Sequence, residues 1–197
     1  MSVKSCVLGF ILLVLCGCAR SAPTNYYLLE SDVEPLQTDR MPKKTLRVAQ
    51  VEIPAYLNRN NIVSRVKGQT ALIIAEFHLW AEPVGAGVRR VIEETLLRPM
   101  LDAGVNVLPS GTASGGDYIL LIDIQRLDGN FNEKAALDAR WTLLDRDERP
   151  IESGIYRAEE LANGANYNIL VAAESKLVRE MGEKLSVILP ALINNRK

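Results

Sequence analysis

Alternating apolar and polar positions run through much of the chain and predict a protein built largely on β-strands. Three such stretches after residue 117 follow one another with short turns, which is typical of an antiparallel meander. The first of these turns is expected at 128–130, where Asp, Gly and Asn adjoin. The predicted strands cover residues 26–29, 46–53, 62–66, 71–80, 105–108, 118–125, 135–144 and 151–158.

The first of two predicted helices follows Pro83, where the spacing of apolar residues changes from two to three or four. A proline just ahead suits the start of a helix, because the first helical N–H groups need no partner within the helix. Pro99 is expected to kink or end this helix, and Gly104 is a natural stop.

The second, longer helix is predicted at the C-terminal end of the chain, with Asn166 or Asn168 as its cap. Its apolar residues follow at steps of three and four, which places them on one stripe facing the core. Charged residues are expected mostly away from that stripe. The stripe consists of Ile169, Ala173, Leu177, Met181, Leu185, Ile188 and Leu192, and the charged residues are Glu174, Lys176, Arg179, Glu183 and Lys184.

These elements indicate an α+β fold. Two helices are expected to pack on one face of a mainly antiparallel sheet, as a two-layer sandwich. No internal repeat and no change of composition marks a second domain, so residues 26–197 are expected to form one periplasmic domain. About 180 residues remain after the N-terminal segment, which is enough to bury a substantial core.

The N-terminal segment has the pattern of a bacterial lipoprotein signal. Lys4 supplies a positive charge, and the apolar run after it is shorter than the roughly 20 residues that span a bilayer. Leu15-Cys16-Gly17-Cys18 then provides a leucine, a small residue before the cut and a cysteine after it. We expect a signal peptide at 1–17, lipidation of Cys18 and a tether at 18–25; the alternative is an ordinary secretory signal with a chance cysteine.

Acylation of Cys18 would anchor the protein to a membrane without spanning it. Ala19 stands where lipoproteins of the inner membrane commonly have Asp, so we expect the outer membrane, with the domain facing the periplasm. Cys6 and Cys16 would leave with the signal peptide, so the mature domain would have no free thiol and no disulfide. A net charge of −1 without a basic stripe argues against nucleic-acid binding.

Residues that could support catalysis or hold a cofactor are scarce. His78 is the only histidine, so a zinc site would lack ligands, and we expect a structural residue in or beside a strand. Gly85 and Gly87 fail the dinucleotide fingerprint, because Arg90 stands at its third glycine position. Asp123 is expected on the open face of the sheet. The sequence therefore predicts a protein that is not an enzyme and needs no cofactor or metal.

Two segments, 53–65 and 77–83, are rich in the aromatic and arginine side chains that concentrate at protein interfaces. Their aromatic residues could be core anchors beneath a turn, or the two segments could form a docking surface. The sequence leaves both interpretations open. The candidate partner-binding residues in these segments are Tyr56, Leu57, Arg59, Arg65, Trp80 and Glu82.

The order of these motifs resembles that of the ABC-type transport auxiliary lipoproteins, the PqiC/YmbA-like lipoproteins of paraquat-inducible and MCE-type lipid transport systems. The resemblance spans nearly the whole chain. It is carried by the lipobox, Tyr-Tyr-Leu-Leu at 26–29, Pro-Ala-Tyr-Leu-Asn-Arg at 54–59, Ile-Val-Ser-Arg at 62–65 and Trp-Ala-Glu-Pro at 80–83.

The resemblance implies an outer-membrane accessory lipoprotein without catalytic activity. Its partner would be an MCE-domain tunnel protein, PqiB-like, which it would help to dock in support of lipid traffic and envelope integrity. A ring-like homo-oligomer would suit a collar around the tip of such a tunnel, although nothing in the composition requires one.

Two other functions stay open from the sequence. An outer-membrane assembly or pilot lipoprotein, for a secretin or a cell-wall synthase, would also be a small α+β domain on a lipid tether. A periplasmic hydrolase would depend on His78. The sequence does not reveal whether a lipid contacts the domain directly.

Overall fold

Eight strands and two helices form the part of the chain that the structure, a computed structural model, describes: residues 22–34, 42–66, 68–112 and 114–195. The predicted signal peptide and Cys18 lie outside these residues. The elements are β1 (Asn25–Tyr27), β2 (Lys44–Val48), β3 (Asn61–Arg65), β4 (Leu72–Trp80), α2 (Val84–Asp102), β5 (Val105–Val107), β6 (Tyr118–Gly129), β7 (Glu133–Asp145), β8 (Pro150–Ala162) and α3 (Tyr167–Asn194).

The three longest strands form the predicted antiparallel meander. β6 pairs with β7, and β7 pairs with β8, along almost their full lengths. The shorter strands lie beyond the other edge of β6, where the pairs β2–β6, β2–β5, β3–β6 and β1–β4 are parallel and only β3–β4 is antiparallel. The sheet is therefore mixed, and the expectation of a mainly antiparallel sheet holds for its long strands.

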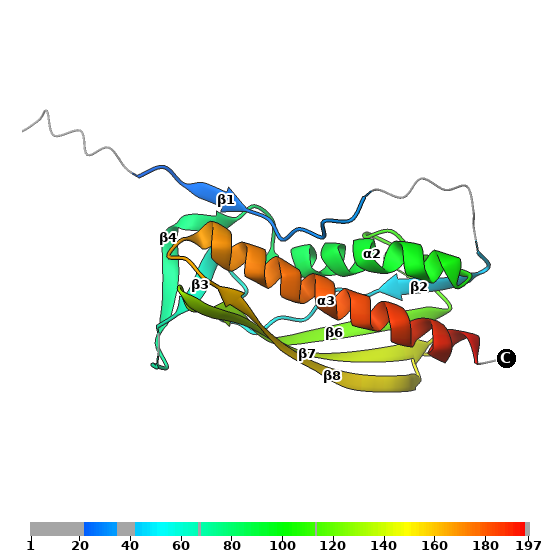
Figure 1. Cartoon of the computed structure of the whole chain (residues 1–197). Coiled ribbons are helices and arrows are strands. Elements are labelled where there is room, and N and C mark those ends of the chain that lie inside the picture. Colours follow the sequence, from blue (N-terminus) through cyan, green and yellow to red (C-terminus); the bar gives the residue numbers. More distant parts are fainter. Residues whose placement is uncertain (1–21, 35–41, 67, 113, 196–197) are drawn as a thin grey trace, which may run out of the picture.

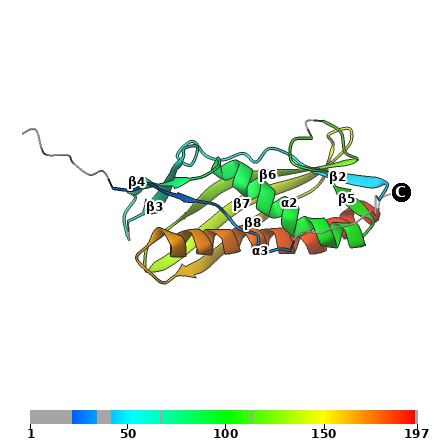
Figure 2. The same ribbon diagram turned by 90° about the horizontal axis from the view of Figure 1, so that it is seen from above.

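Both helices lie side by side on one face of the sheet, which confirms the α+β arrangement (Figures 1 and 2). The core fills the space between the two layers. A Cβ on Gly182 of α3 would lie 2.9 Å from the side chain of Thr95 in α2, so this glycine permits the close approach of the helices. Asp123 and Arg140 are exposed on the opposite, open face of the sheet, as expected for Asp123.

Both helix starts follow the sequence, but α2 does not end at its proline. Asn166 caps α3 by accepting a hydrogen bond from the N–H of Ile169 (3.1 Å). α2 continues through Pro99 to Asp102, and Gly104, with φ +80°, follows. Pro99 cannot donate the backbone hydrogen bond to Thr95, and burial of the neighbouring Leu96 and Met100 offsets this loss.

Several strand boundaries also differ from the prediction, and those of β2 and β6 matter most for the site. The strand expected at 46–53 ends at Val48, and the chain contacts β6 again only through the isolated bridge between Glu52 and Asp123. β6 continues through Asp128 to Gly129, so Asp128 belongs to a strand and not to a turn. A register shift in β6 between Ile124 and Arg126 changes which side chains face outward, and hydrogen bonds described below satisfy the Asp128 carboxylate there.

The last turns of α3 bury a different stripe from the predicted one. Leu189 and Ile193 are fully buried, whereas Ile188 is 39% exposed. Glu174 was expected away from the core but is only 1% exposed. Its position explains this, because it lies four residues from both Leu170 and Val178, which are fully buried.

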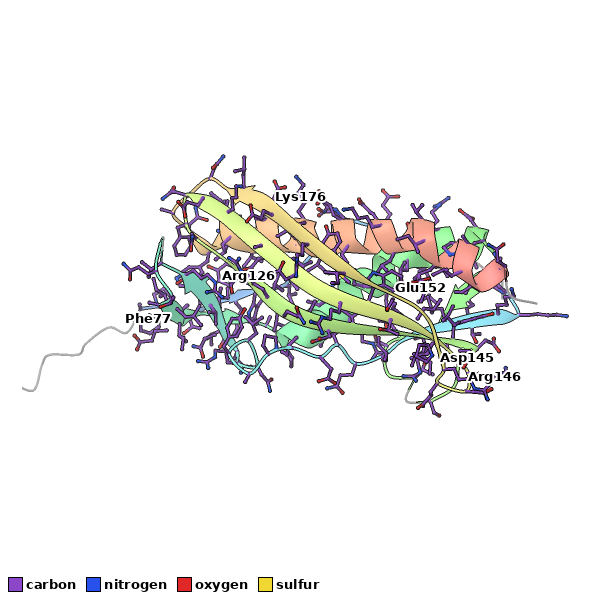
Figure 3. All side chains as sticks on the ribbon, turned by 90° about the horizontal axis from the view of Figure 1, so that it is seen from below. Phe77, Arg126, Asp145, Arg146, Glu152 and Lys176 are labelled. Carbon is purple, nitrogen blue, oxygen red and sulfur yellow. The ribbon has the colours of Figure 1, made fainter. Side chains whose placement is uncertain are left out.

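The molecule is elongated, and different elements occupy its two ends (Figures 1 and 3). β3, β4 and the start of β1 lie at one end, where Phe77 is labelled in Figure 3. The C-terminal end of α3 and the β7–β8 turn, with Asp145 and Arg146, lie at the other. Within the described ranges, neither helix is long and apolar enough to cross a bilayer.

Candidate functional site

The two aromatic-arginine segments meet in space at the end of the molecule that carries β3 and β4. The N–H of Trp80 donates a hydrogen bond to the carbonyl oxygen of Asn60 (2.6 Å), which joins the second segment directly to the first. Leu57 and Trp80 are buried in the core, with 3% and 7% of their surface exposed. We call this region, residues 53–65 and 77–83, the signature corner.

A buried carboxylate, Asp128 on β6, holds the first segment in place. The hydroxyl of Tyr56 donates to its Oδ2 (2.8 Å), and Nε of Arg65 donates to its Oδ1 (2.6 Å). Nε of Arg126, labelled in Figure 3, donates to the same Oδ1 (2.9 Å). Asp128 is fully buried, so three charged or polar donors replace the water that its carboxylate would otherwise bind.

The electrostatics of this Asp128 cluster favour the ionised carboxylate. Burial by itself would raise the pKa of Asp128, but the hydrogen bonds from Arg65, Arg126 and Tyr56 outweigh burial and hold the pKa below its ordinary value. Burial and then the hydrogen bond to Asp128 raise the pKa of Tyr56 to about 12, so its hydroxyl stays protonated. The hydrogen bond to Asp128 raises the pKa of Arg65.

An ion pair anchors the second segment. Nη2 of Arg90, on α2, donates to Oε1 of Glu82 (2.8 Å) and to the carbonyl oxygen of Leu29 (2.7 Å). Arg90 thus connects Glu82 to Leu29, in the chain that follows β1. Burial lowers the pKa of Arg90, but the contacts with Glu82 outweigh it, so the net change is upward.

The predicted site residues therefore differ in what they offer to a partner. Tyr56, Arg65 and Glu82 are engaged in internal contacts but stay partly exposed. Arg59 is partly buried, and its Nε has no hydrogen-bond partner among the described residues. Leu57 and Trp80 contribute to the core.

A hollow of about 410 Å³ lies between the signature corner and the start of α2. Ile53, Asn58 and Pro83 of the corner line it, together with Ala86 and Arg89 of α2. Asn58, Pro83 and Ala86 are exposed, so a partner that bound this corner would contact them. The hollow combines amide, apolar and charged surface, with Glu52 as well as Arg89 in its lining, and such mixed surface also occurs at protein interfaces.

His78 has a structural role in β4, as the sequence indicated. Its Nδ1 and the hydroxyl of Tyr27 share a hydrogen bond of 2.7 Å, and its ring stacks on Tyr167 with 4.0 Å between centroids. The interaction joins β1, β4 and α3. In the ranges that the structure describes, no group of three His, Cys, Asp or Glu side chains could hold a metal ion.

Glu174 is a second buried carboxyl group, on the face of α3 that packs against the sheet. Its Oε2 has no hydrogen-bond partner among the described residues. Burial raises the pKa of Glu174 well above its ordinary value, and the negative charge of Asp128 raises it further. The two carboxyl groups thus have opposite pKa shifts, because only Asp128 is compensated by arginines.

Replacing Glu174 by glutamine is expected to stabilise the protein at neutral and alkaline pH, by about 1–3 kcal/mol. Glutamine is uncharged in both the folded and the unfolded chain, so folding no longer requires a carboxylate to take up a proton. As pH rises above the ordinary carboxyl range, the unfolded chain ionises Glu174 while the folded chain retains its proton, so the wild type loses stability. Urea unfolding between about pH 5 and about pH 8 measures this difference.

The exposed Glu183 on the same helix supplies the control for Glu174→Gln. Glu183→Gln should leave the pH dependence of unfolding nearly as in the wild type. A Glu174→Gln protein whose stability falls with pH as steeply as that of the wild type would contradict the assignment of a protonated Glu174.

Comparison with known families identifies the relatives of this chain. The family model of the ABC-type transport auxiliary lipoprotein component matches residues 26–186. The chain belongs to this family. The family description is that of an accessory lipoprotein of a transport system, which points to a non-catalytic role and leaves the membrane and the partner open.

Two solved structures share the fold of this auxiliary lipoprotein. A protein described as uncharacterized has 18% sequence identity and a TM-score of 0.70, covering 85% of this chain and 99% of its own. A DUF330-family protein from Xanthomonas campestris has 17% identity and a TM-score of 0.66, covering 88% of this chain and 100% of its own. At these identities the likeness shows the fold alone. The comparison with curated proteins found no match.

Sequence reasoning missed two residues that organise this auxiliary lipoprotein. Asp128 was assigned to a turn because Asp, Gly and Asn adjoin, and no local signal connects it to Tyr56 or Arg65. Glu174 did have a signal, since it lies at helical spacing between the apolar Leu170 and Val178.

Proposed function

We propose that this auxiliary lipoprotein is held at the outer membrane by acylated Cys18 and docks an MCE-domain tunnel protein, PqiB-like, of an ABC-type lipid transport system. The family match over residues 26–186 carries this proposal. The lipobox that ends at Cys18 supports the anchor, and Ala19 after it favours the outer membrane. The protein then acts by binding and positioning its partner, without catalysis and without a cofactor.

Partner contact is assigned to the signature corner and the hollow beside it. Leu57 and Trp80 fix the backbone of the corner from the core, while Tyr56, Arg65 and Glu82 present partly exposed edges. Arg59 is also partly exposed, although its Nε is buried without a hydrogen-bond partner among the described residues. Tyrosine, tryptophan and arginine are the side chains that most often dominate binding energy at interfaces.

Co-purification from envelopes tests the partner. The tagged wild-type protein is expected to recover an MCE-domain protein. Asn58→Arg, at the exposed rim of the hollow, should lower that recovery about tenfold, the effect of losing roughly 1.4 kcal/mol of binding free energy. Asn195→Arg is the matched control, because Asn195 is also exposed but follows α3 at the opposite end of the molecule.

The same preparation tests the anchor. A Cys18→Ser protein should leave the outer-membrane fraction and recover less of the MCE-domain protein, because it loses the acylated sulfur. Recovery of the wild type without any MCE-domain protein would overturn the assigned partner. A Cys18→Ser protein with unchanged location would overturn the anchor.

A further inference from the structure

An arm formed by β3 and β4 extends from the end of the molecule that carries the start of β1 (Figure 1). Three successive residues at the beginning of β4, Leu72, Ile73 and Ile74, are 37%, 43% and 49% exposed. Successive residues of a strand point to opposite faces, so both faces of this part of β4 are in contact with solvent. Three exposed aliphatic side chains at one tip require a further explanation.

The outer edge of the arm has no strand partner in the described ranges. β3 pairs with one edge of β4, and β1 pairs with the other edge only at His78, Leu79 and Trp80. The edge from Leu72 to Phe77 is therefore open. An open apolar edge is a liability in water, which proteins usually cover or charge.

The arm is attached firmly to the body of the molecule. Arg65, at the end of β3, is bound to the buried Asp128 (2.6 Å). Nδ2 of Asn61 donates to the carbonyl oxygen of Ala75 across the two strands (2.7 Å). Arg65 pairs with Leu72 at the tip, whereas Asn61 lies farther back along the arm. The arm is thus held in a fixed direction along its length.

Cys18 and the tip of the arm lie at similar maximum distances from one place on the protein, the pair formed by Asn25 and His78. Asn25 of β1 lies opposite His78 of β4. The seven residues from Cys18 to Asn25 span at most about 25 Å. The six residues from His78 to Leu72 span at most about 20 Å, whichever way the strand bends. A membrane that holds Cys18 is therefore close enough for the tip to touch.

The composition of the arm suits a phospholipid surface. Residues 61–75 contain no Asp or Glu, and the exposed Glu76 is the first acidic residue after them. Exposed aliphatic side chains in a segment without negative charge favour the interface of a membrane. The open backbone edge of β4 limits how deeply the tip can enter a bilayer, because its N–H and C=O groups must stay hydrated.

From these observations we infer that the tip of the β3–β4 arm is a second membrane contact, in which Leu72, Ile73 and Ile74 enter the headgroup region of the bilayer that holds the lipid anchor. This inference rests on the acylation of Cys18 in the proposed function. With two contacts, the domain no longer rotates freely on its tether. Arg65, which pairs with Leu72, then lies at the headgroups. The hollow lined by Asn58 and Ala86 is held at a defined angle to the membrane.

A single fluorophore on the arm tests the contact in the full-length lipidated protein. The mature sequence has no cysteine other than Cys18, so Ile73→Cys introduces the only free thiol. Labelled there with an environment-sensitive dye, the protein is reconstituted into vesicles of phosphatidylethanolamine with a minority of phosphatidylglycerol. Ile155→Cys is the matched control, because Ile155 is 64% exposed and lies on the edge strand β8.

The emission of the dye at position 73 is expected to shift to the blue when the protein is reconstituted. Iodide in the water should quench it several-fold less than it quenches the dye at position 155. A nitroxide at the lipid headgroup should quench it strongly. At position 155 none of these changes should appear. Equal quenching by iodide at both positions would overturn the inference.

Two other results would assign the tip to a protein. Protection of position 73 that grows with protein density at constant lipid would assign it to a second copy of the chain. Protection only after addition of the MCE-domain partner would assign it to that partner. Either result overturns the membrane contact.

Flotation of the unlabelled wild type separates this inference from the proposed function. If the wild type floats with the vesicles but the dye at position 73 stays in water, the anchor is supported and only the membrane contact of the arm is overturned. Wild-type protein that fails to float overturns both.

Discussion

Asp128→Ala is expected to lower the free energy of unfolding by about 3 kcal/mol, which is the lower end of the range for breaking a buried ion pair. The substitution leaves the guanidinium groups of Arg65 and Arg126 without their shared carboxylate, and the hydroxyl of Tyr56 without an acceptor. The lower end applies because the two arginine side chains are 28% and 33% exposed, so water partly replaces the lost contacts. Urea or thermal unfolding measures the change.

Two further variants show whether this loss belongs to the Asp128 cluster. Asp123→Ala removes an exposed carboxylate from the same strand and should change stability by no more than about 0.5 kcal/mol. Tyr56→Phe removes one hydrogen bond to Asp128 and should cost about 1 kcal/mol. Equal losses in Asp128→Ala and Asp123→Ala would contradict the structural role of the cluster.

The loss should also depend on pH, in a direction that follows from the lowered pKa of Asp128. The ionised carboxylate stabilises the folded state above the ordinary pKa of an aspartate, and this contribution is lost as pH falls through the lower pKa of the folded state. The difference in free energy of unfolding between the wild type and Asp128→Ala should therefore be largest at neutral pH and should decrease in acid. A gap that widened in acid would contradict this assignment.

Gly129→Ala is expected to destabilise the fold by about 1–3 kcal/mol or more, as is usual for overpacking. A Cβ there would lie 2.7 Å from both Cα of Ala135 and the carbonyl oxygen of Lys134, and 2.8 Å from Cδ1 of Leu170. The first two atoms belong to the backbone of the paired strand β7, so they cannot rotate away. The backbone of Gly129 is not in the left-handed region, so the close approach itself causes the loss.

Gly85→Ala provides the comparison for Gly129→Ala. A Cβ at position 85 would lie 3.2 Å from its nearest neighbour, the carbonyl oxygen of Val51, a tight contact that a small shift relieves. Alanine is also favoured over glycine within a helix, by about 1 kcal/mol. Thermal unfolding should show a near-neutral Gly85→Ala and a strongly destabilised Gly129→Ala; similar melting temperatures would contradict the packing seen at Gly129.

Patterns between neighbouring residues determined much of the fold. The alternation of Leu137, Ala139, Trp141 and Leu143 was sufficient to identify β7, because burial of one face of a strand requires that pattern and little else. An asparagine cap at 166 or 168 and the apolar stripe were sufficient to place the start of α3 within two residues, for the same local reason, and the structure selects Asn166. The order of the motifs along the chain was sufficient for the family.

Contacts between distant segments were decided only by the tertiary structure. Tyr56 lies 72 residues from Asp128 in the sequence, and their contact depends on how β3 and β6 are brought together. A pattern of neighbours carries no information about such a pairing, so it left Asp128 in a turn. The open arm at Leu72–Ile74 had the same cause, since the sequence of a strand shows which faces are apolar but not where the rest of the sheet ends.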